Sequence, residues 1–301
     1  MSIDQKHLDN LIPEAREVLQ SNNEDRIRYL RTRKFIMYGR AKEILSKLED
    51  LMDEPKGSRM PCLLIVGDSH SGKTSIVEKL LRMHPPTDGI EEAAMPVVLI
   101  SAPGTPDPNA LLDRILKRLV LPFKKTDSIT KKESEVEYHF VNLGVRILVI
   151  DEIHNILSGS VPKQKAFMNT LKNLCNEIRI PIVLVGTKDA LHATDVDLQI
   201  SSRFRPMLLP RWKLDSNYVS LLASIEKTVP LKKLSDLAKD KKLAEKILDL
   251  SEGLLGEIVY IITESGIRAI KTGAEAITLE IIEDYKFVKP SQTRGLEVLE
   301  A

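Results

Sequence analysis

Short apolar runs dominate the middle of the chain, and segments with helical periodicity separate them. The runs cover residues 62–66, 97–101, 147–151, 182–186 and, more weakly, 207–210. They consist mainly of Val, Ile and Leu without polar alternation, which is typical of strands buried on both faces of a parallel sheet. The helical segments between them, expected to be crossovers, cover residues 73–83, 108–119 and 163–178. The pattern predicts an α/β fold, a doubly wound parallel sheet flanked by helices, of about 150 residues.

Helical periodicity also precedes the sheet. Apolar residues recur at helical spacing over residues 4–20, and a second helix is expected from about Arg26 to Leu51. That second helix begins with basic residues before any acidic one: Arg26, Arg28, Arg31, Arg33, Lys34, Arg40 and Lys42. Such a block is either the solvated face of an amphipathic helix or a contact for nucleic acid or another subunit, and the pattern leaves both open.

No further strand is expected after Trp212. The remaining helical segments cover residues 215–227, 231–239, 241–250, 255–272 and 278–287. The breaks between these patterns predict an organisation in four parts: a helical arm over 1–56, the α/β domain over 57–212, a helical lid over 213–288 and a tail over 289–301.

Composition narrows the class of protein. The chain has 301 residues, 43% of them hydrophobic, and 44 basic residues against 43 acidic ones. These values exclude a disordered chain, and the net charge of +1 neither requires nor excludes a polyanionic partner. No run approaches the roughly 20 apolar residues of a membrane span, so we expect a cytoplasmic protein. Cys62 and Cys175 lack the spacing of a zinc site and are expected to be buried, reduced thiols.

The first apolar run ends in a glycine-rich phosphate-binding pattern, G-x-x-x-x-G-K-[ST], between a strand and a helix. The residues expected to surround ATP are Gly67, Asp68, Ser69, His70, Ser71, Gly72, Lys73, Thr74 and Ser75. The glycines let backbone N–H groups point at the phosphates, and the helix N-terminus adds positive charge. We expect Lys73 to reach the outer phosphates and Thr74 to offer its hydroxyl to Mg²⁺.

The third apolar run ends in an acidic pair, Asp151 and Glu152. Because the ligand crevice of a parallel sheet lies at the carboxyl ends of its strands, this pair is expected to face the phosphates. Asp151 is then a candidate to hold Mg²⁺ together with Thr74. Glu152 is the candidate to polarise the attacking water.

Two further candidate positions lie near the last two runs. Thr187 ends the fourth run and is expected beside the γ-phosphate. Arg203 and Arg205 precede the fifth run, where a guanidinium can reach a phosphate of a neighbouring subunit, and the sequence does not decide between them. His70 and His154 are interpreted as polar loop residues because no third metal ligand stands at a suitable spacing.

These motifs resemble, over about residues 26–286, the TniB/TnsC family of AAA+ ATPases, the ATP-utilising regulators of transposition. The resemblance rests on SRMPCLLIVGDSHSGKT, GVRILVIDEIHNILSG, IPIVLVGT, SSRFRPMLLPRW and SEGLLGEI. It implies an ATPase that forms a ring or helical filament on double-stranded DNA and links a target selector of the TniQ/TnsD type to a transposase. By the resemblance, residues 67–74 match Walker A, Asp151 and Glu152 match Walker B, Thr187 matches sensor 1 and Arg203 matches the arginine finger.

One position departs from the wider AAA+ pattern. Gly256 and Glu257 stand where many AAA+ proteins have a sensor-2 arginine at the start of a lid helix. Hydrolysis is therefore expected to be slow and dependent on assembly. The competing interpretations are a stand-alone or clamp-loader-like NTPase and an inactive nucleotide-binding scaffold.

A basic segment between the second strand and the acidic pair is the candidate DNA contact. It holds Arg114, Lys117, Arg118, Lys124, Lys125, Lys131 and Lys132 against few acidic residues. Repeated along the pore of a ring, Lys124, Lys125, Lys131 and Lys132 could follow a phosphate backbone without reading bases. A solvated loop is the alternative.

Overall fold

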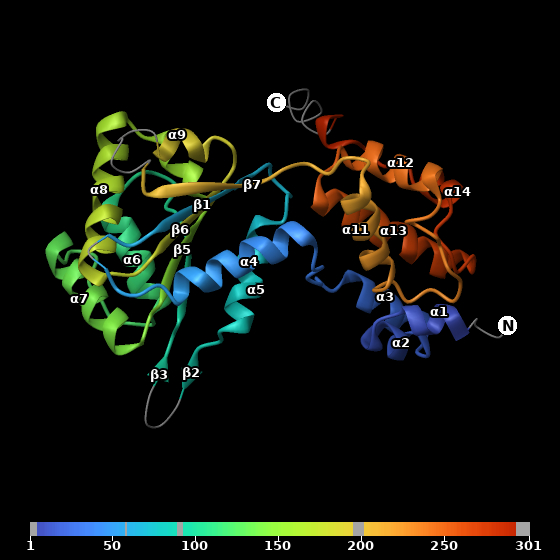
Figure 1. Cartoon of the computed structure of the whole chain (residues 1–301), viewed down its shortest axis with the longest axis horizontal. Helices are drawn as coiled ribbons and strands as arrows, with labels where there is room; N and C mark the ends of the chain where they lie inside the picture. Colours follow the sequence, from blue (N-terminus) through green and yellow to red (C-terminus); the bar gives the residue numbers. More distant parts are fainter. Residues whose placement is uncertain (1–4, 58, 89–92, 195–201, 293–301) are drawn as a thin grey trace. The chain divides into compact units, whose positions relative to one another are not determined.

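The computed structural model describes residues 5–57, 59–88, 93–194 and 202–292 (Figure 1). The chain divides into two compact units, an α/β unit of Arg40–Leu209 and a helical unit formed by Met1–Gly39 together with Pro210–Ala301. These boundaries differ from the expected four parts, because the first 39 residues join the C-terminal helices instead of forming a separate arm. Most of the expected tail lies outside the described residues.

The α/β unit is built on a parallel sheet of five strands in the order β4-β5-β6-β1-β7. The strands are β1 (Cys62–Gly67), β4 (Val97–Ser101), β5 (Ile147–Asp151), β6 (Ile182–Gly186) and β7 (Phe204–Leu209). Every position of β1, β5 and β6 is buried, as their continuous apolar sequences require. The predicted α/β fold class is confirmed.

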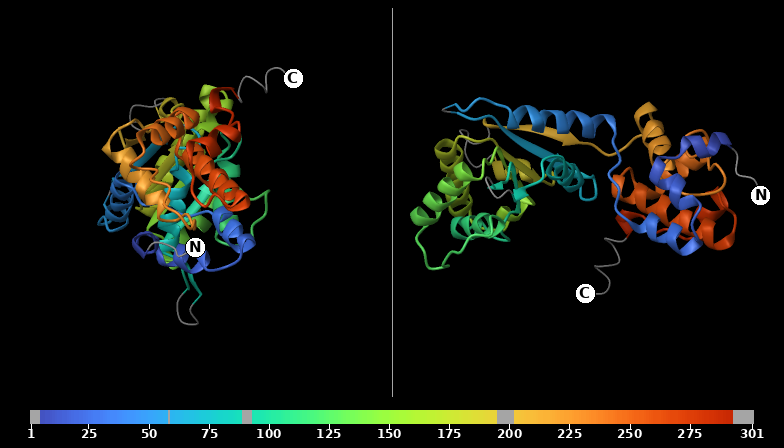
Figure 2. Two further views of the ribbon diagram at one scale, coloured as in Figure 1. Left: turned by 90° about the vertical axis from the view of Figure 1, so that its right-hand side faces the viewer. Right: turned by 90° about the horizontal axis from the view of Figure 1, so that it is seen from below.

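Helices flank this sheet (Figure 2). They are α4 (Gly39–Met52), α5 (Lys73–Met83), α6 (Pro108–Arg118), α7 (Ile129–Asn142), the 3₁₀ helix η1 (Ile153–Ser158), α8 (Val161–Ile178) and α9 (Ala190–Thr194). The short strands β2 (Thr87–Asp88) and β3 (Ala93–Ala94) pair as an antiparallel hairpin. Helix α7 was not expected from the sequence. It packs through Val136 and Phe140, both fully buried.

The two cysteines meet inside the α/β unit. Both are free and buried, and their Sγ atoms lie 3.6 Å apart, Cys62 at the start of β1 and Cys175 on α8. The hydrogen bond between the two thiols and the burial of Cys62 raise the pKa of the Cys62 thiol. This thiol therefore stays protonated at neutral pH.

The helical unit combines segments from both ends of the chain. It holds α1 (Gln5–Asn10), α2 (Pro13–Leu19), α3 (Asn23–Arg31), α11 (Ser216–Glu226), α12 (Lys241–Ser251), α13 (Leu255–Thr272) and α14 (Leu279–Asp284). Side-chain caps begin four of these helices, supplied by Asn22, Asp215, Asp240 and Thr278. Leu30 of α3 lies in the same apolar cluster as residues of α11 and α13. No helix among the described residues is long and apolar enough to cross a membrane.

A buried ion pair fixes α3 to the C-terminal helices. Arg26 is 0% exposed, and its guanidinium donates to the carboxylate of Glu275 at 2.9 and 2.5 Å and to the carbonyl oxygen of Pro230. For Arg26, both alternatives for the basic block, a solvated face and a contact for nucleic acid or another subunit, are therefore wrong, because its charge is buried and paired within the chain. The single helix expected from Arg26 to Leu51 is also interrupted, since α3 and α4 are separate.

The helix expected over residues 231–239 does not form. The segment is irregular, and Asp236 adopts a left-handed backbone conformation with φ of 55°. The carboxylate of Glu226 accepts the backbone N–H of Ser235, and that of Glu275 accepts the N–H of Lys232. Side chains thus satisfy backbone groups that a helix would have paired internally.

Candidate functional site

The phosphate-binding loop connects β1 to α5, and two of its glycines are required by its shape. Gly72 has φ of 94°, a left-handed conformation in which a side chain is strained. A Cβ at Gly67 would lie 2.6 Å from Oγ of Ser71 and 2.9 Å from the carbonyl oxygen of Leu209. The backbone can therefore close around a phosphate only with glycine at both positions.

Lys73 lies folded into this loop. Its Nζ donates to the carbonyl oxygens of Gly67 at 2.9 Å and Asp68 at 2.8 Å. Burial lowers the pKa of Lys73, and the carboxylates of Asp151, Glu152 and Asp68 oppose that shift. A buried cation with carbonyl partners suits exchange of those carbonyls for phosphate oxygens, which bind an ammonium group more strongly.

Thr74 and Asp151 meet at the mouth of the loop. The Thr74 hydroxyl donates to Oδ2 of Asp151 at 2.7 Å, and Oδ1 of Asp151 accepts the backbone N–H of Glu152 at 2.7 Å. A hydroxyl and a carboxylate in contact are an oxygen donor set that fits Mg²⁺. Among the described residues, the buried Oγ of Ser71 has no hydrogen-bond partner, so a polar group inside the loop remains free to bind a phosphate.

Glu152 and Thr187 lie on the same side of the sheet as the loop, because both follow the carboxyl ends of parallel strands. Oε2 of Glu152 lies 3.1 Å from Nε2 of His154, and the backbone N–H of Thr187 donates to Nδ1 of the same ring at 3.5 Å. Lys188 forms an ion pair with Asp68 of the phosphate-binding loop at 3.1 Å. The contacts of His154 and Lys188 were not predicted, because no motif or residue spacing in the sequence indicates them.

Arg203 lies at the opposite edge of the sheet from the phosphate-binding loop. Strand β7 pairs in parallel with β1 in the register Cys62 with Phe204, so Arg203 is next to the amino end of β1. The loop follows the carboxyl end of that strand, roughly 17 to 20 Å away at about 3.3 Å per residue. Arg203 donates to Oδ1 of Asn176 at 2.8 Å. Across that length of strand, Arg203 does not reach the phosphate-binding loop of its own chain.

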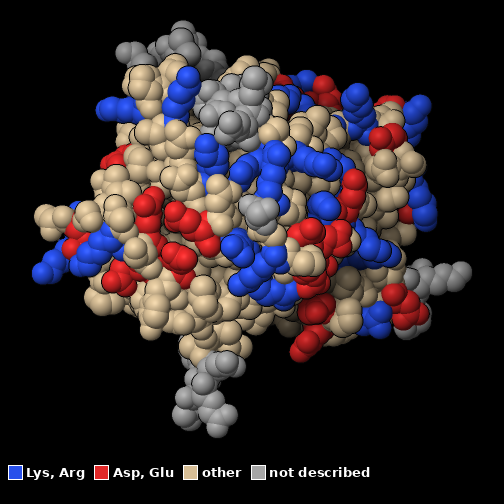
Figure 3. Space-filling model, turned by 60° about the vertical axis from the view of Figure 1, so that its left-hand side comes forward, with Lys and Arg blue, Asp and Glu red and all other residues tan. Residues whose placement is uncertain are grey.

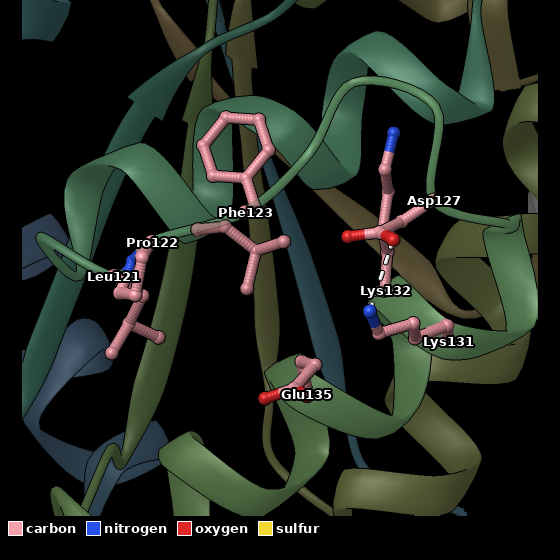
Figure 4. Close-up of a pocket in the computed structure, with 8 residues that line it drawn as sticks. Leu121, Pro122, Phe123, Asp127, Lys131, Lys132 and Glu135 are labelled. Atoms are coloured by element: carbon pink, nitrogen blue, oxygen red, sulfur yellow. Dashed lines mark hydrogen bonds and ion pairs between the residues drawn. The ribbon is translucent and has the colours of Figure 1, made fainter.

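The basic segment is only partly available to DNA. Lys124 and Lys125 are exposed on the loop between α6 and α7, and Lys131 forms an ion pair with Asp127 at 2.9 Å (Figure 4). Lys132 is 1% exposed and its Nζ lies 2.8 Å from a carboxylate oxygen of Asp113. Lys132 is therefore not a DNA contact, because its charge is buried and paired. Figure 3 shows one face of the molecule, on which Lys and Arg gather beside Asp and Glu.

The sheet order, the phosphate-binding loop between β1 and α5, and the acidic pair after β5 define the AAA+ class of P-loop NTPases. Solved structures of that fold are similar to this chain. Cdc6p from Pyrobaculum aerophilum is 16% identical with a TM-score of 0.62, covering 86% of this chain and 70% of its own. The Aeropyrum pernix ORC2 protein in ADPNP and ADP complexes is 14% identical with a TM-score of 0.60, covering 85% and 70%.

A third similar structure is the Aeropyrum pernix ORC1 protein in complex with DNA, 15% identical with a TM-score of 0.60, covering 86% of this chain and 68% of its own. At these identities the likeness shows the fold alone. The family described as bacterial TniB protein matches residues 26–214, more than half of the chain. The chain belongs to the TniB family, which confirms the resemblance seen in the sequence. No curated protein sequence matches it.

Proposed function

We propose that the chain hydrolyses ATP in the service of transposition, with the chemistry at the carboxyl edge of the sheet. The observation that carries this proposal is the 2.7 Å contact between Thr74 and Asp151, with Glu152 following directly. Lys73 would bind the outer phosphates and Thr74 with Asp151 would hold Mg²⁺. Mg²⁺, when bound, neutralises charge on the phosphates.

Glu152 and Thr187 complete the proposed reaction site. The Glu152 carboxylate is half exposed, so it can reach a water molecule in front of the γ-phosphate. It would accept a proton from that water as the oxygen attacks phosphorus. Thr187, at the end of the strand between β5 and β1, would contact the γ-phosphate. ATP and water would give ADP and phosphate.

Two variants separate binding from hydrolysis. Lys73→Ala removes the charge that complements the phosphates and should abolish ATP binding, measured with a fluorescent ATP analogue. Glu152→Gln should keep that affinity and lower the rate of phosphate release by about 10²- to 10⁴-fold, the usual contribution of a general base. Equal loss of ATP affinity in both variants would show that these roles are wrongly assigned.

Assembly on double-stranded DNA is the second part of the proposal. The position of Arg203 at the edge opposite the phosphate-binding loop supports an arginine that acts on the neighbouring subunit in a homo-oligomer. Hydrolysis would then be slow in the monomer and depend on assembly as a ring or helical filament. Such an assembly in the cytoplasm would link a target selector of the TniQ/TnsD type to the transposase.

The DNA contact is proposed for the exposed Lys124 and Lys125, with Lys131 beside them. Neutralising both Lys124 and Lys125 to Gln should flatten the slope of log K against log salt, because fewer condensed counterions are released. ATP binding by the monomer should not change.

The matched control is the pair formed by Arg31, the last residue of α3, and Arg33 just beyond it, both exposed in the helical unit. Their replacement by Gln should leave the slope unaltered. A flattened slope in the control and an unaltered one in the lysine variant would move the contact to the helical unit. An unaltered slope in both double variants would show that Lys124 and Lys125 are solvated surface residues that do not contact DNA.

A further inference from the structure

His154 links two parts of the proposed reaction site. It lies in η1, two residues after Glu152, and its ring stands between the Glu152 carboxylate and the backbone of Thr187. Its side chain is about one quarter exposed. Glu152 itself has φ of 57°, a left-handed conformation that turns the chain from β5 into η1. This turn brings the histidine ring back toward the carboxylate.

The contacts define the proton position on the ring. The backbone N–H of Thr187 can only donate, so Nδ1 of His154 is the acceptor and carries no proton. In a neutral imidazole the proton is then on Nε2, which donates to Oε2 of Glu152 across 3.1 Å. The ring thus accepts a hydrogen bond from the backbone of Thr187 and donates one to the carboxylate of Glu152.

Gly186, the last residue of β6, packs close to the segments that carry His154 and Thr187. A Cβ added at Gly186 would lie 3.4 Å from Nδ1 of His154, 3.1 Å from Cγ2 of Ile153 and 2.8 Å from Cβ of Ala190. The close approaches are to Ala190 and Ile153, whereas the ring of His154 lies at an ordinary contact distance, so a side chain at Gly186 would disturb the segments on either side of this ring. Lys188, beside Thr187, forms an ion pair with Asp68 of the phosphate-binding loop. Residues 187–188 therefore contact both the phosphate-binding loop and, through His154, the carboxylate of Glu152.

We propose that His154 is a positioning residue that ties the Glu152 carboxylate to the backbone of Thr187. The orientation of the water-activating group then depends on the segment that contacts the γ-phosphate, so Glu152 is aligned when that segment is engaged. This inference rests on the proposed ATPase function, because it assigns Glu152 the role of base.

The two ring nitrogens can be tested separately. His154→Gln places an amide donor where Nε2 reaches Glu152, whereas His154→Asn retains an acceptor near Nδ1 and cannot reach the carboxylate. His154→Ala removes both contacts. Removing a partner that orients a reacting group typically lowers activity by about 10- to 100-fold. We therefore expect kcat to fall by that factor in the Ala and Asn variants at unchanged KM, and to recover in part in the Gln variant, which restores the contact with Glu152 but not the one with Thr187.

Three controls make the experiment decisive. His192→Ala changes an exposed histidine on the neighbouring α9 and should retain wild-type kcat. Thermal melting of every variant reports folding. In a Glu152→Gln background, His154→Ala should cause no further loss, because the two residues act as one unit.

The outcomes distinguish the inference from the function on which it rests. If the wild type releases no more phosphate than Glu152→Gln, the proposed function fails. If the wild type is active and His154→Ala retains its kcat, or if His154→Gln is as impaired as His154→Ala, the positioning role fails. A fall in ATP affinity and melting temperature with kcat unchanged would assign His154 a purely structural role and overturn the proposal.

Discussion

Replacing Arg26 with Met tests how the N-terminal helices are held in the helical unit. The guanidinium is fully buried and makes hydrogen bonds to Glu275, to the carbonyl oxygen of Pro230 and to Asn23. Met fills the volume of the aliphatic stem but leaves the Glu275 carboxylate without its main partner. Breaking a buried ion pair from one side costs about 3 to 5 kcal/mol. Glu275 keeps the backbone N–H of Lys232, so we expect the lower end of that range.

Urea unfolding followed by tryptophan fluorescence measures this loss of unfolding free energy in the helical unit, which contains both Arg26 and Glu275. Trp212 is the only tryptophan of the chain, and it packs against Tyr38 with ring centroids 5.1 Å apart inside the helical unit. The companion variant Glu275→Gln loses the charge but keeps hydrogen-bonding atoms, and should cost about 1 to 2 kcal/mol. A loss below about 1 kcal/mol for Arg26→Met would contradict this assignment, because a largely buried carboxylate that loses its main hydrogen-bond donor must cost more than that.

The same pair predicts how stability depends on pH. Burial raises the pKa of Glu275, but the hydrogen bonds from Arg26 and Lys232 outweigh it, so the pKa is lower than in the unfolded chain. The stability that this carboxylate contributes is present above its unfolded pKa and is lost as pH falls through the folded pKa. The difference between wild type and Arg26→Met should therefore be full at pH 7 and shrink below about pH 4.3. A difference that is constant from pH 7 to pH 3 would contradict this assignment.

Arg203→Ala should slow hydrolysis but leave ATP binding by the monomer unchanged. Mixing this variant with Glu152→Gln should restore some activity at hybrid interfaces. No rescue at any mixing ratio would exclude an arginine acting in trans. Lys132→Met should lower the free energy of unfolding by about 1 to 3 kcal/mol without changing the salt dependence of DNA binding, because the lysine is buried and paired. Gly253→Ala should destabilise the helical unit by more than about 1 kcal/mol, because φ of Gly253 is 71° and the new Cβ would lie 2.4 Å from the carbonyl oxygen of Trp212. An unchanged midpoint of urea unfolding, followed by fluorescence, would disprove that clash.

The sheet and its chemistry were predictable because they depend on local signals. Unbroken apolar runs identify β1 and β5, and the carboxyl ends of parallel strands meet at one edge of the sheet. Gly67 and Gly72 stand at positions that demand glycine, so the phosphate-binding loop was predicted from spacing alone. Asp151 was expected to face this loop because the ligand crevice of a parallel sheet lies at the carboxyl ends of its strands, whereas its hydrogen bond with Thr74 was found only in the structure.

Other features depend on partners distant in the chain. Arg26 and Lys132 were expected to be exposed because the sequence does not show their partners. Arg26 pairs with Glu275 and Lys132 pairs with Asp113, both of which are distant in the chain. His154 was interpreted as a polar loop residue because its two contacts arise from a backbone turn at Glu152 that no spacing rule describes. Long-range pairing of charges and local backbone turns thus account for what the sequence pattern could not predict.

ATP-dependent assembly on DNA is tested by the binding of the chain to fluorescent duplex DNA, measured by anisotropy across a salt series with ATP, with ADP and without nucleotide. The Glu152→Gln variant with ATP should bind most tightly and with the steepest salt slope, because an assembled oligomer aligns many lysines along the phosphates. Without nucleotide, or in Lys73→Ala, binding should be on the order of micromolar or weaker. Equal affinity and slope with and without ATP would contradict ATP-dependent assembly on DNA.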